Sequence, residues 1–269
     1  MKTMNNKDYE IEELAPGLFA IDDDKGNSTY LIEGSEKALV IDTGMMGGKI
    51  IPVISSLTGK PIELALTHAH GDHMYHAGEF KTVYLHEADI AAWRPALCLV
   101  THAGELMFGV SMKRYNTKSF IPITGSFEFD LGGNTIKTIL AKGHTPGSCV
   151  FVDEKHEAVF MGDAVGSGLS VWLWFPGCSN IHEYKESVES LLKKLEPYKK
   201  YKFFGGHRKQ TREGEANYPL DFGLVNDMYT LCRKILNHDI APKKQKFSFF
   251  TIDVYSFNAA TIWTRDKQI

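Results

Sequence analysis

The chain has few cysteines, no long apolar run and no marked excess of charge of one sign. Its four cysteines, Cys98, Cys149, Cys178 and Cys232, are widely spaced and form no Cys-x-x-Cys pair. We interpret them as reduced, mostly buried thiols of a cytoplasmic protein, with a nucleophilic cysteine as the less favoured alternative. No stretch reaches the roughly 18 apolar residues of a membrane helix. Residues 1–10 are polar, so we expect no secretory signal.

The overall charge is close to balanced. The sequence has 30 Lys and Arg residues against 33 Asp and Glu residues, a net charge of −3. This gives no support for a nucleic-acid surface, and the scattered lysines between 193 and 202 are most simply a solvated face. Hydrophobic residues make up 43% of the 269 residues, enough for a substantial core. No low-complexity linker divides the chain, so we expect a single domain over residues 1–269.

One short stretch concentrates metal-binding side chains. His68, His70, Asp72 and His73 fall within six residues, directly after the apolar run 62–66. Imidazole and carboxylate groups bind Zn²⁺ and its first-row neighbours at neutral pH. In an extended chain His68 and His70 point to the same side and can share one ion. Asp72 and His73 lie beyond a glycine and can offer ligands to a second ion. A chance cluster on a solvated turn is the disfavoured alternative.

Three further candidates stand where an apolar strand gives way to a glycine turn. His144 lies in a Gly- and Pro-rich turn, Asp163 follows Gly162, and His207 follows Gly206. Strand ends of this kind deliver side chains into a shared cleft. We therefore predict that the three residues join the first cluster, whereas a lone histidine at such a place would more often be a capping or surface group.

Apolar periodicity predicts alternating strands and helices, the pattern of sheets with helices packed on them. Residues 94–120 are read as an insertion that could cover the site. Strands are expected at 18–21, 29–33, 37–42, 61–67, 82–85, 127–129, 135–140, 148–152, 158–161 and 200–204 and within 247–264, and helices at 47–57, 74–80, 86–93, 182–195 and 217–236.

As a set, the motifs resemble those of the metallo-β-lactamase superfamily. In chain order they read Thr67-His68-Ala69-His70-Gly71-Asp72-His73, Gly143-His144-Thr145-Pro146-Gly147, Gly162-Asp163 and Gly206-His207. The likeness runs from about residue 18 to 210. It implies an α+β fold, a four-layer αββα sandwich of two sheets with outer helices, and a site at one edge between the sheets.

The resemblance implies a dinuclear metal site with two zinc ions per chain, iron or manganese being alternatives. Three neutral imidazoles leave an open position for a water, as a catalytic zinc requires, and a metal-bound hydroxide would attack the substrate. Asp72 could orient this nucleophile and later pass a proton to the leaving group, and Thr67 and Thr145 could support the ligands. The first ion would be held by His68, His70 and His144, the second by Asp72, His73 and His207, with Asp163 bridging them.

Departures from the family patterns narrow the activity. Asp163 stands where one group of β-lactamases has a cysteine ligand, so the chain resembles the glyoxalase II, lactonase and ribonuclease Z side of the superfamily. The Cys-Gly-Arg segment of glyoxalase II is missing, and Gly166 stands where lactonases have a tyrosine. We predict a zinc-dependent hydrolase of a small ester, thioester, lactone or lactam. A phosphodiesterase or nuclease with the same site, and a mononuclear iron enzyme like persulfide dioxygenase, are the alternatives.

Contacts to the substrate are harder to read. Trp172, Trp174 and Phe175 could form an apolar wall, with packing under a neighbouring helix as an equally weighted alternative. Arg208 could pair with an anionic substrate, although a structural ion pair is favoured. His76 as an extra ligand and a substrate role for His102 are both disfavoured. We expect a small-molecule substrate, no nucleic-acid or membrane partner, and leave homo-oligomerisation open.

Overall fold

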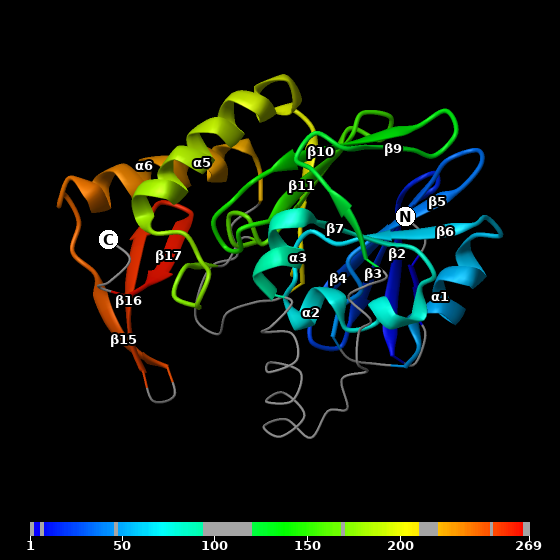
Figure 1. Ribbon diagram of the computed structural model, residues 1–269, viewed down its shortest axis with the longest axis horizontal. Helices are drawn as coiled ribbons and strands as arrows, with labels where there is room; N and C mark the ends of the chain where they lie inside the picture. Colours follow the sequence, from blue (N-terminus) through cyan, green and yellow to red (C-terminus); the bar gives the residue numbers. More distant parts are fainter. Residues whose placement is uncertain are drawn as a thin grey trace.

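The computed structural model describes residues 3–5, 8–45, 48–93, 120–167, 170–209, 220–247 and 250–265. Within these ranges the chain forms three β-sheets, with helices packed outside the first two (Figure 1). The expected insertion at 94–120 lies outside the described residues except for Phe120, which begins a strand, and His102 and Cys98 lie outside them too.

The first sheet contains eight strands that follow one another in chain order. Neighbouring strands are antiparallel from β1 to β5 and parallel from β5 to β8. The helices α1 (Ile50–Leu57), α2 (Gly71–Met74) and α3 (Glu87–Trp93) and the 3₁₀ turn η1 (Ala77–Glu79) lie in the connections between parallel strands. The strands are β1 (Thr3–Asn5), β2 (Tyr9–Ala15), β3 (Leu18–Asp23), β4 (Ser28–Glu33), β5 (Ala38–Ile41), β6 (Ile62–Ala65), β7 (Val83–His86) and β8 (Phe120–Ile123).

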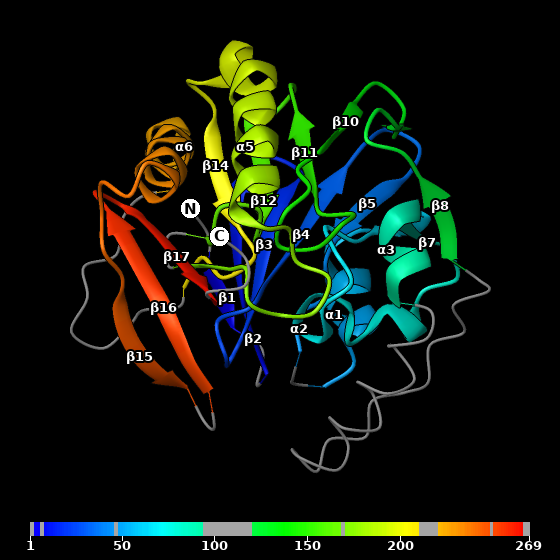
Figure 2. The same cartoon turned by 60° about the vertical axis from the view of Figure 1, so that its left-hand side comes forward.

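The second sheet has the order β14-β12-β11-β10-β9. Helices α5 (Ile181–Leu195) and α6 (Phe222–Leu236) cover its outer face, side by side in Figure 2, and the 3₁₀ turn η3 (Glu196–Tyr198) follows α5. Its strands are β9 (Glu128–Asp130), β10 (Thr135–Leu140), β11 (Cys149–Asp153), β12 (Ala158–Gly162) and β14 (Lys202–Gly205).

Alternation along buried strands explains why the two sheets stack. In β5, Val40 packs toward α1 with Ile54, while Leu39 packs on the other face with Phe151 of the second sheet. Successive side chains of a strand point to opposite faces, so one strand can serve both interfaces. The resulting order of helices, sheet, sheet and helices confirms the α+β, four-layer αββα sandwich (Figure 1).

The strands expected within 247–264 do not extend either main sheet. They are β16 (Phe250–Phe257) and β17 (Ala260–Thr264), and with β13 (Val171–Trp172) and β15 (Lys243–Phe247) they form a third sheet of order β13-β17-β16-β15. One face packs on α6 through Tyr255 and Ile262, and the other carries Ile252 and Trp263. Because the carbonyl of Trp172 in β13 accepts a hydrogen bond from His144 and β13 pairs with β17, this sheet lies beside the turn that carries His144.

Two expected helices have shifted bounds. The predicted position of the helix at 74–80 is wrong. Helix α2 begins at Gly71, within the histidine cluster, and ends at Met74, and only the 3₁₀ turn η1 lies in the rest of the predicted range. Helix α6 begins at Phe222 because Asp221 accepts a hydrogen bond from the Leu224 amide; residues 217–219 lie outside the described part. Among the described residues, the search for a membrane-spanning segment finds no helix with the necessary length and hydropathy.

Candidate metal centre

The seven candidate ligands lie on loops at one edge of the two main sheets. His68, His70, Asp72 and His73 follow β6, His144 lies in the turn between β10 and β11, and Asp163 and His207 follow β12 and β14. Backbone hydrogen bonds tie these loops together. The Cys149 amide donates to the Thr67 carbonyl at 2.8 Å, and the Gly206 amide donates to the Gly162 carbonyl at 3.1 Å.

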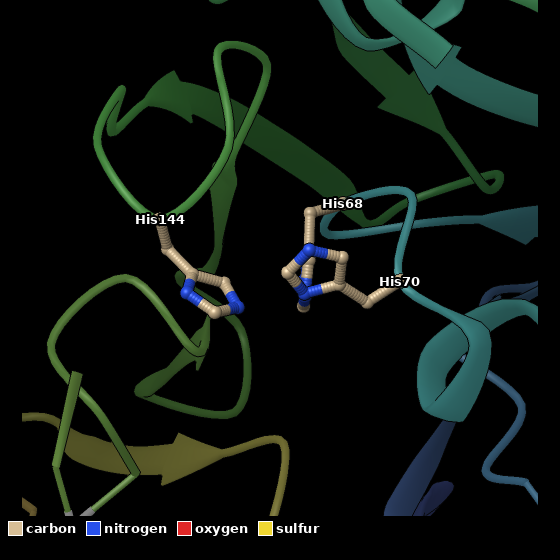
Figure 3. A group of neighbouring side chains, drawn as sticks. All are labelled: His68, His70 and His144. Atoms are coloured by element: carbon tan, nitrogen blue, oxygen red, sulfur yellow. The ribbon is translucent and has the colours of Figure 1, made fainter. Parts of the chain in front are cut away.

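Three imidazoles converge at one end of the centre. His68 Nε2 lies 3.1 Å from His70 Nδ1, and the ring of His144 lies 4.4 Å from that of His70 and 4.9 Å from that of His68, centroid to centroid. Figure 3 shows the three rings turned toward a common space from two different loops. One nitrogen from each ring lies within 4.8 Å of the others, which is a group that could hold a metal ion.

A second group lies beside the first. Asp72 Oδ2 is 3.8 Å from His73 Nε2 and 3.5 Å from His207 Nε2. Asp163 Oδ2 lies between the groups, 3.2 Å from His207 Nε2, 3.6 Å from His73 Nε2 and 3.8 Å from His144 Nε2. The structure thus brings together all seven residues that the sequence singled out as metal-binding.

Two glycines make this close approach feasible. A Cβ on Gly206 would lie 2.4 Å from His73 Cε1 and 2.8 Å from Asp163 Oδ1. At Gly162, where φ is +47°, a Cβ would lie 2.6 Å from Thr67 Oγ1. The strand-end glycines are therefore required by the space next to the ligands, because a larger side chain would displace them.

Asp42, which the sequence analysis did not single out, orients His73 directly and His68 through Thr67. Its Oδ1 accepts a hydrogen bond from the Thr67 amide, and its Oδ2 accepts bonds from Thr67 Oγ1 at 2.7 Å and His73 Nδ1 at 2.9 Å. Its signal was present in the sequence, because Asp42 ends an apolar strand before Thr43-Gly44, as Asp163 ends another.

These hydrogen bonds fix which ring nitrogen faces the centre. The hydroxyl hydrogen of Thr67 is directed to Asp42, so Thr67 Oγ1 accepts from His68 Nδ1 at 3.0 Å. His144 Nδ1 donates to the Trp172 carbonyl at 2.8 Å. His68, His73 and His144 are thereby held with Nδ1 as the donor to these groups, and each turns its Nε2 inward, the orientation that a metal ligand needs.

Burial and charge divide the imidazoles into two classes. Burial and neighbouring imidazoles lower the pKa of His68 well below its usual value and that of His70 to about 3, and burial lowers the pKa of His144. Burial also acts to lower the pKa of His73 and His207, but the Asp163 and Asp72 carboxylates outweigh it and raise both. Neutral imidazoles are ready to bind a cation, and a bound cation would take the place of the protons that balance the carboxylates.

The carboxylates are ionised for the same reason. Burial alone would raise the pKa of Asp72 and Asp163, but the charges of His207 and His73 lower it, and for Asp163 they lower it well below its usual range. Both groups can therefore act as anionic ligands at neutral pH.

The donor atoms fit a metal ion. Within the described part of the chain, His73 Nε2 and His144 Nε2 are buried and have no hydrogen-bond partner. A buried polar atom without a partner costs about 1–3 kcal/mol. Both atoms point at Asp163 Oδ2 and the other ligand atoms, so a cation among them would satisfy nitrogen and carboxylate together.

The aromatic residues expected near the site form a cluster on its rim. The rings of Phe175 and His70 are 5.8 Å apart, and Trp174 stacks on Phe175 at 4.1 Å. Trp172 stacks on Trp263 of β17 at 5.4 Å. We call these four aromatic residues the aromatic rim; Trp263 was not anticipated from the sequence.

Two charged or titratable candidates lie elsewhere. Arg208 makes a two-nitrogen contact with Asp22 and reaches Glu12 at 2.7 Å, so the structure assigns it to an ion-pair network, and we do not retain the predicted substrate contact. His76 lies between Glu79 and Tyr9 and is absent from the metal-binding groups found among the described residues.

Comparison with known proteins gives a family match. The family model described as "Metallo-beta-lactamase superfamily" matches residues 22–207, a range that contains all seven candidate ligands. The relative named "Lactamase-like protein ptaB", from Pestalotiopsis fici, is 31% identical over 169 residues, 59% of this chain and 47% of that protein. "Uncharacterized protein YobT" of Bacillus subtilis is 30% identical over 158 residues, 55% of this chain and 64% of that protein.

The chain thus spans less than two thirds of these two relatives. A longer match is to "Acyl-coenzyme A thioesterase MBLAC2" of Homo sapiens, 25% identical over 228 residues, 74% of this chain and 81% of that protein. Among solved structures, VMB-1 aligns with a TM-score of 0.61 at 19% identity over 86% of this chain and 100% of that chain. Protein ST1585 from Sulfolobus tokodaii aligns with a TM-score of 0.53 at 18% identity, over 84% and 85%. At such identities the structural likeness shows the fold alone.

Proposed function

Because the chain belongs to the metallo-beta-lactamase superfamily, we propose that it is a dinuclear zinc hydrolase of a small ester or thioester, with lactones and lactams as related substrates. One observation supports this most strongly. Asp163 Oδ2 lies within 3.8 Å of imidazole nitrogens from both ligand groups, a position suited to a bridge between two cations. The first zinc would be held by His68, His70 and His144, the second by Asp72, His73 and His207, and Asp163 would join them.

Bound zinc would supply positive charge for the substrate oxygen and lower the pKa of an adjacent water. The chain supplies the remaining parts. Asp72 is the most exposed of the charged ligands, with a third of its side chain accessible, against 16% for Asp163. We propose Asp72 as the catalytic residue: its free carboxylate oxygen would orient the attacking water, accept its proton and deliver it to the leaving group.

An acyl thioester or ester is the substrate class we favour. The aromatic rim borders the centre, and Trp172 and Phe175 are only partly buried, so an acyl group could pack against their exposed surface. One curated relative, matched over 74% of this chain, has a name that describes an acyl-coenzyme A thioesterase, and this supports the thioester linkage. A small-molecule substrate and a cytoplasmic location belong to the same proposal.

Metal analysis combined with a substrate panel tests the proposal. Purified protein is analysed for zinc, iron and manganese and then assayed on chromogenic ester, thioester, lactone, lactam and bis-phosphodiester substrates. We expect about two zinc per chain and hydrolysis of the acyl substrates, abolished by Asp72→Ala and by His144→Ala. One iron per chain would point to the dioxygenase alternative, and activity on the phosphodiester alone to the nuclease alternative. Activity that survives both substitutions would overturn the assigned site.

A further inference from the structure

Asp89, in the first turn of α3, has its side chain inside the protein with no exposed surface. Its Oδ2 accepts hydrogen bonds from the Ala69 amide at 3.0 Å and from Thr145 Oγ1 at 2.8 Å. Its Oδ1 accepts a bond from the Gly147 amide at 2.6 Å. One carboxylate therefore joins two loops that are far apart in the sequence.

These two loops carry the ligands of the first proposed ion. Ala69 lies between His68 and His70, and Thr145 follows His144. We propose that Asp89 is a positioning residue that sets the spacing of these three imidazoles and thereby the affinity of the first ion. The inference rests on the proposed metal site.

The contact between α3 and the His144 turn is close. A Cβ on Gly147 would lie 2.8 Å from the Cγ and backbone nitrogen of Asp89, so the turn can approach the helix only because this residue is glycine. Ser148 Oγ accepts from the Thr145 amide at 3.0 Å and lies 2.8 Å from Thr145 Oγ1. The hydroxyl that meets Asp89 is itself fixed by the turn, which makes the link rigid.

The second group of ligands has a different support. His73 is oriented by Asp42, the residue directly after β5, and no hydrogen bond of Asp89 reaches Asp72, His73 or His207 in the described structure. A change at Asp89 should therefore act on one ion and leave the other.

The carboxylate is retained at a cost. Burial raises the pKa of Asp89 to about 6 although its three hydrogen bonds lower it, and no ion pair between Asp89 and a basic side chain occurs within the described ranges. Buried charge without a counter-ion is unfavourable for folding, so a role in holding the two loops accounts for its presence better than a contribution to stability.

Asparagine cannot replace this group. Both carboxylate oxygens accept from backbone N–H groups, at Ala69 and at Gly147. An amide offers one oxygen and one NH₂ group, so one N–H would face another donor and lose its partner. Asp89→Asn keeps the shape of the side chain but breaks the link between the loops.

Zinc affinity measured by competition with a chromogenic chelator tests the inference. We expect Asp89→Asn to weaken one of the two zinc sites about 10–100-fold, the usual effect of losing a group that orients metal ligands, and to leave the other unchanged. Thr145→Val removes only one of the three hydrogen bonds and should weaken the same site by a smaller factor. Should Asp89→Asn fail to fold, Thr145→Val decides the question.

Asp153→Asn is the matched control. Asp153 is equally buried and accepts hydrogen bonds from His156 and the Lys155 amide, away from the ligands. The Asp153→Asn substitution should lower the melting temperature of the metal-free protein, as Asp89→Asn does, but it should leave both zinc affinities unchanged. The assignment to the first ion is checked in a His144→Ala background, where adding Asp89→Asn should cause no further loss of zinc.

Three results would overturn the inference: zinc affinities of Asp89→Asn equal to those of the unsubstituted chain, equal weakening of both sites, or the same pattern in Asp153→Asn. If the unsubstituted chain binds no zinc, iron or manganese, the proposed function fails as well, and that result is distinct from the other three.

Discussion

Carboxylates that do not touch the proposed ions determine how the ligands face them. Asp42 orients His73 and, through Thr67, His68. Asp89 links the loops of His68 and His144. Because each carboxylate comes from a different element of the first sheet or its helices, the geometry of the centre depends on packing well away from it.

Gly206 allows the tightest contact at the centre, and its replacement should disrupt metal binding. We expect Gly206→Ala to push aside His73 and Asp163, since the new Cβ would lie 2.4 Å from His73 Cε1, and to weaken zinc binding about tenfold or more. Isothermal titration with zinc measures the effect.

Gly59→Ala is the control for this substitution, because a Cβ there meets nothing within 4 Å. It should leave zinc binding unchanged. Equal zinc binding by the two alanine variants would show that the space beside His73 is not limiting.

His156 should make stability depend on pH. Its hydrogen bond to Asp153, 2.5 Å long, raises the pKa of His156 above its usual value of 6.5. A raised folded-state pKa means that the stabilisation is complete below about pH 6.5 and is lost as the pH rises through the folded-state pKa.

Replacement by glutamine removes this charged hydrogen bond. His156→Gln should cost about 1.5–3 kcal/mol of unfolding free energy at pH 5.5 and less at alkaline pH. Urea titrations of both proteins from pH 5.5 to alkaline pH measure the difference in unfolding free energy. The metal ligands are the same in both proteins, so their titration cancels from this difference. A difference that grows with pH would contradict the assignment.

At the scale of elements, β13 and β17 place the aromatic rim. Their parallel pairing sets Trp172 opposite Trp263, and the Leu173 amide donates to the Trp263 carbonyl at 2.8 Å. The third sheet thus fixes the wall next to the proposed ions, although three of its four strands, β15, β16 and β17, lie outside the matched range 22–207.

Phe175→Ala should reduce the preference for longer acyl chains. Each methylene buried against the rim is worth about 0.8 kcal/mol, or roughly fourfold in kcat/KM. We expect kcat/KM to rise with chain length in the unsubstituted enzyme and to flatten in the variant, with acetyl substrates little affected.

Phe127→Ala is the matched control, since Phe127 is also partly buried but packs with Tyr84 and Phe129 away from the rim. It should keep the chain-length dependence. A steep dependence that survives Phe175→Ala would remove the rim from substrate binding.

The sequence predicted the elements that bury continuous apolar segments, such as β5, β12 and α5. It also predicted the seven side chains that the fold brings together, because glycines at strand ends beside histidines or aspartates are a local signal. It missed β15, whose residues Lys243–Phe247 are mostly polar on an edge strand. It also missed Asp89, which reads as an ordinary helix residue. The link between Asp89 and Thr145 depends on the tertiary fold, and no local pattern encodes it.

At the scale of the whole molecule, the proposed ions would join the two main sheets. His68, His70, Asp72 and His73 follow a strand of the first sheet, and Asp163 and His207 follow strands of the second. Metal at 1,000 times its Kd stabilises a folded protein by about 4 kcal/mol, which for a chain of this size corresponds to roughly 8–16 °C in Tm.

Removal of metal with a chelator should therefore lower Tm by about this amount, and zinc should restore it. Calorimetry of the treated and reloaded protein measures both steps. The His144→Ala variant should show a smaller response because it retains one ion. If the chelator does not change Tm, the centre does not stabilise the packing of the two sheets.

The carbonyl of Trp172, which accepts a hydrogen bond from His144 Nδ1, belongs to β13, and β13 pairs with β17, the last described strand of the chain. Strand β17 therefore influences the proposed ligand His144 through one intervening strand. We therefore expect relatives with the same seven ligands but a different β17 to differ in metal affinity, and the ligands alone would not predict that affinity.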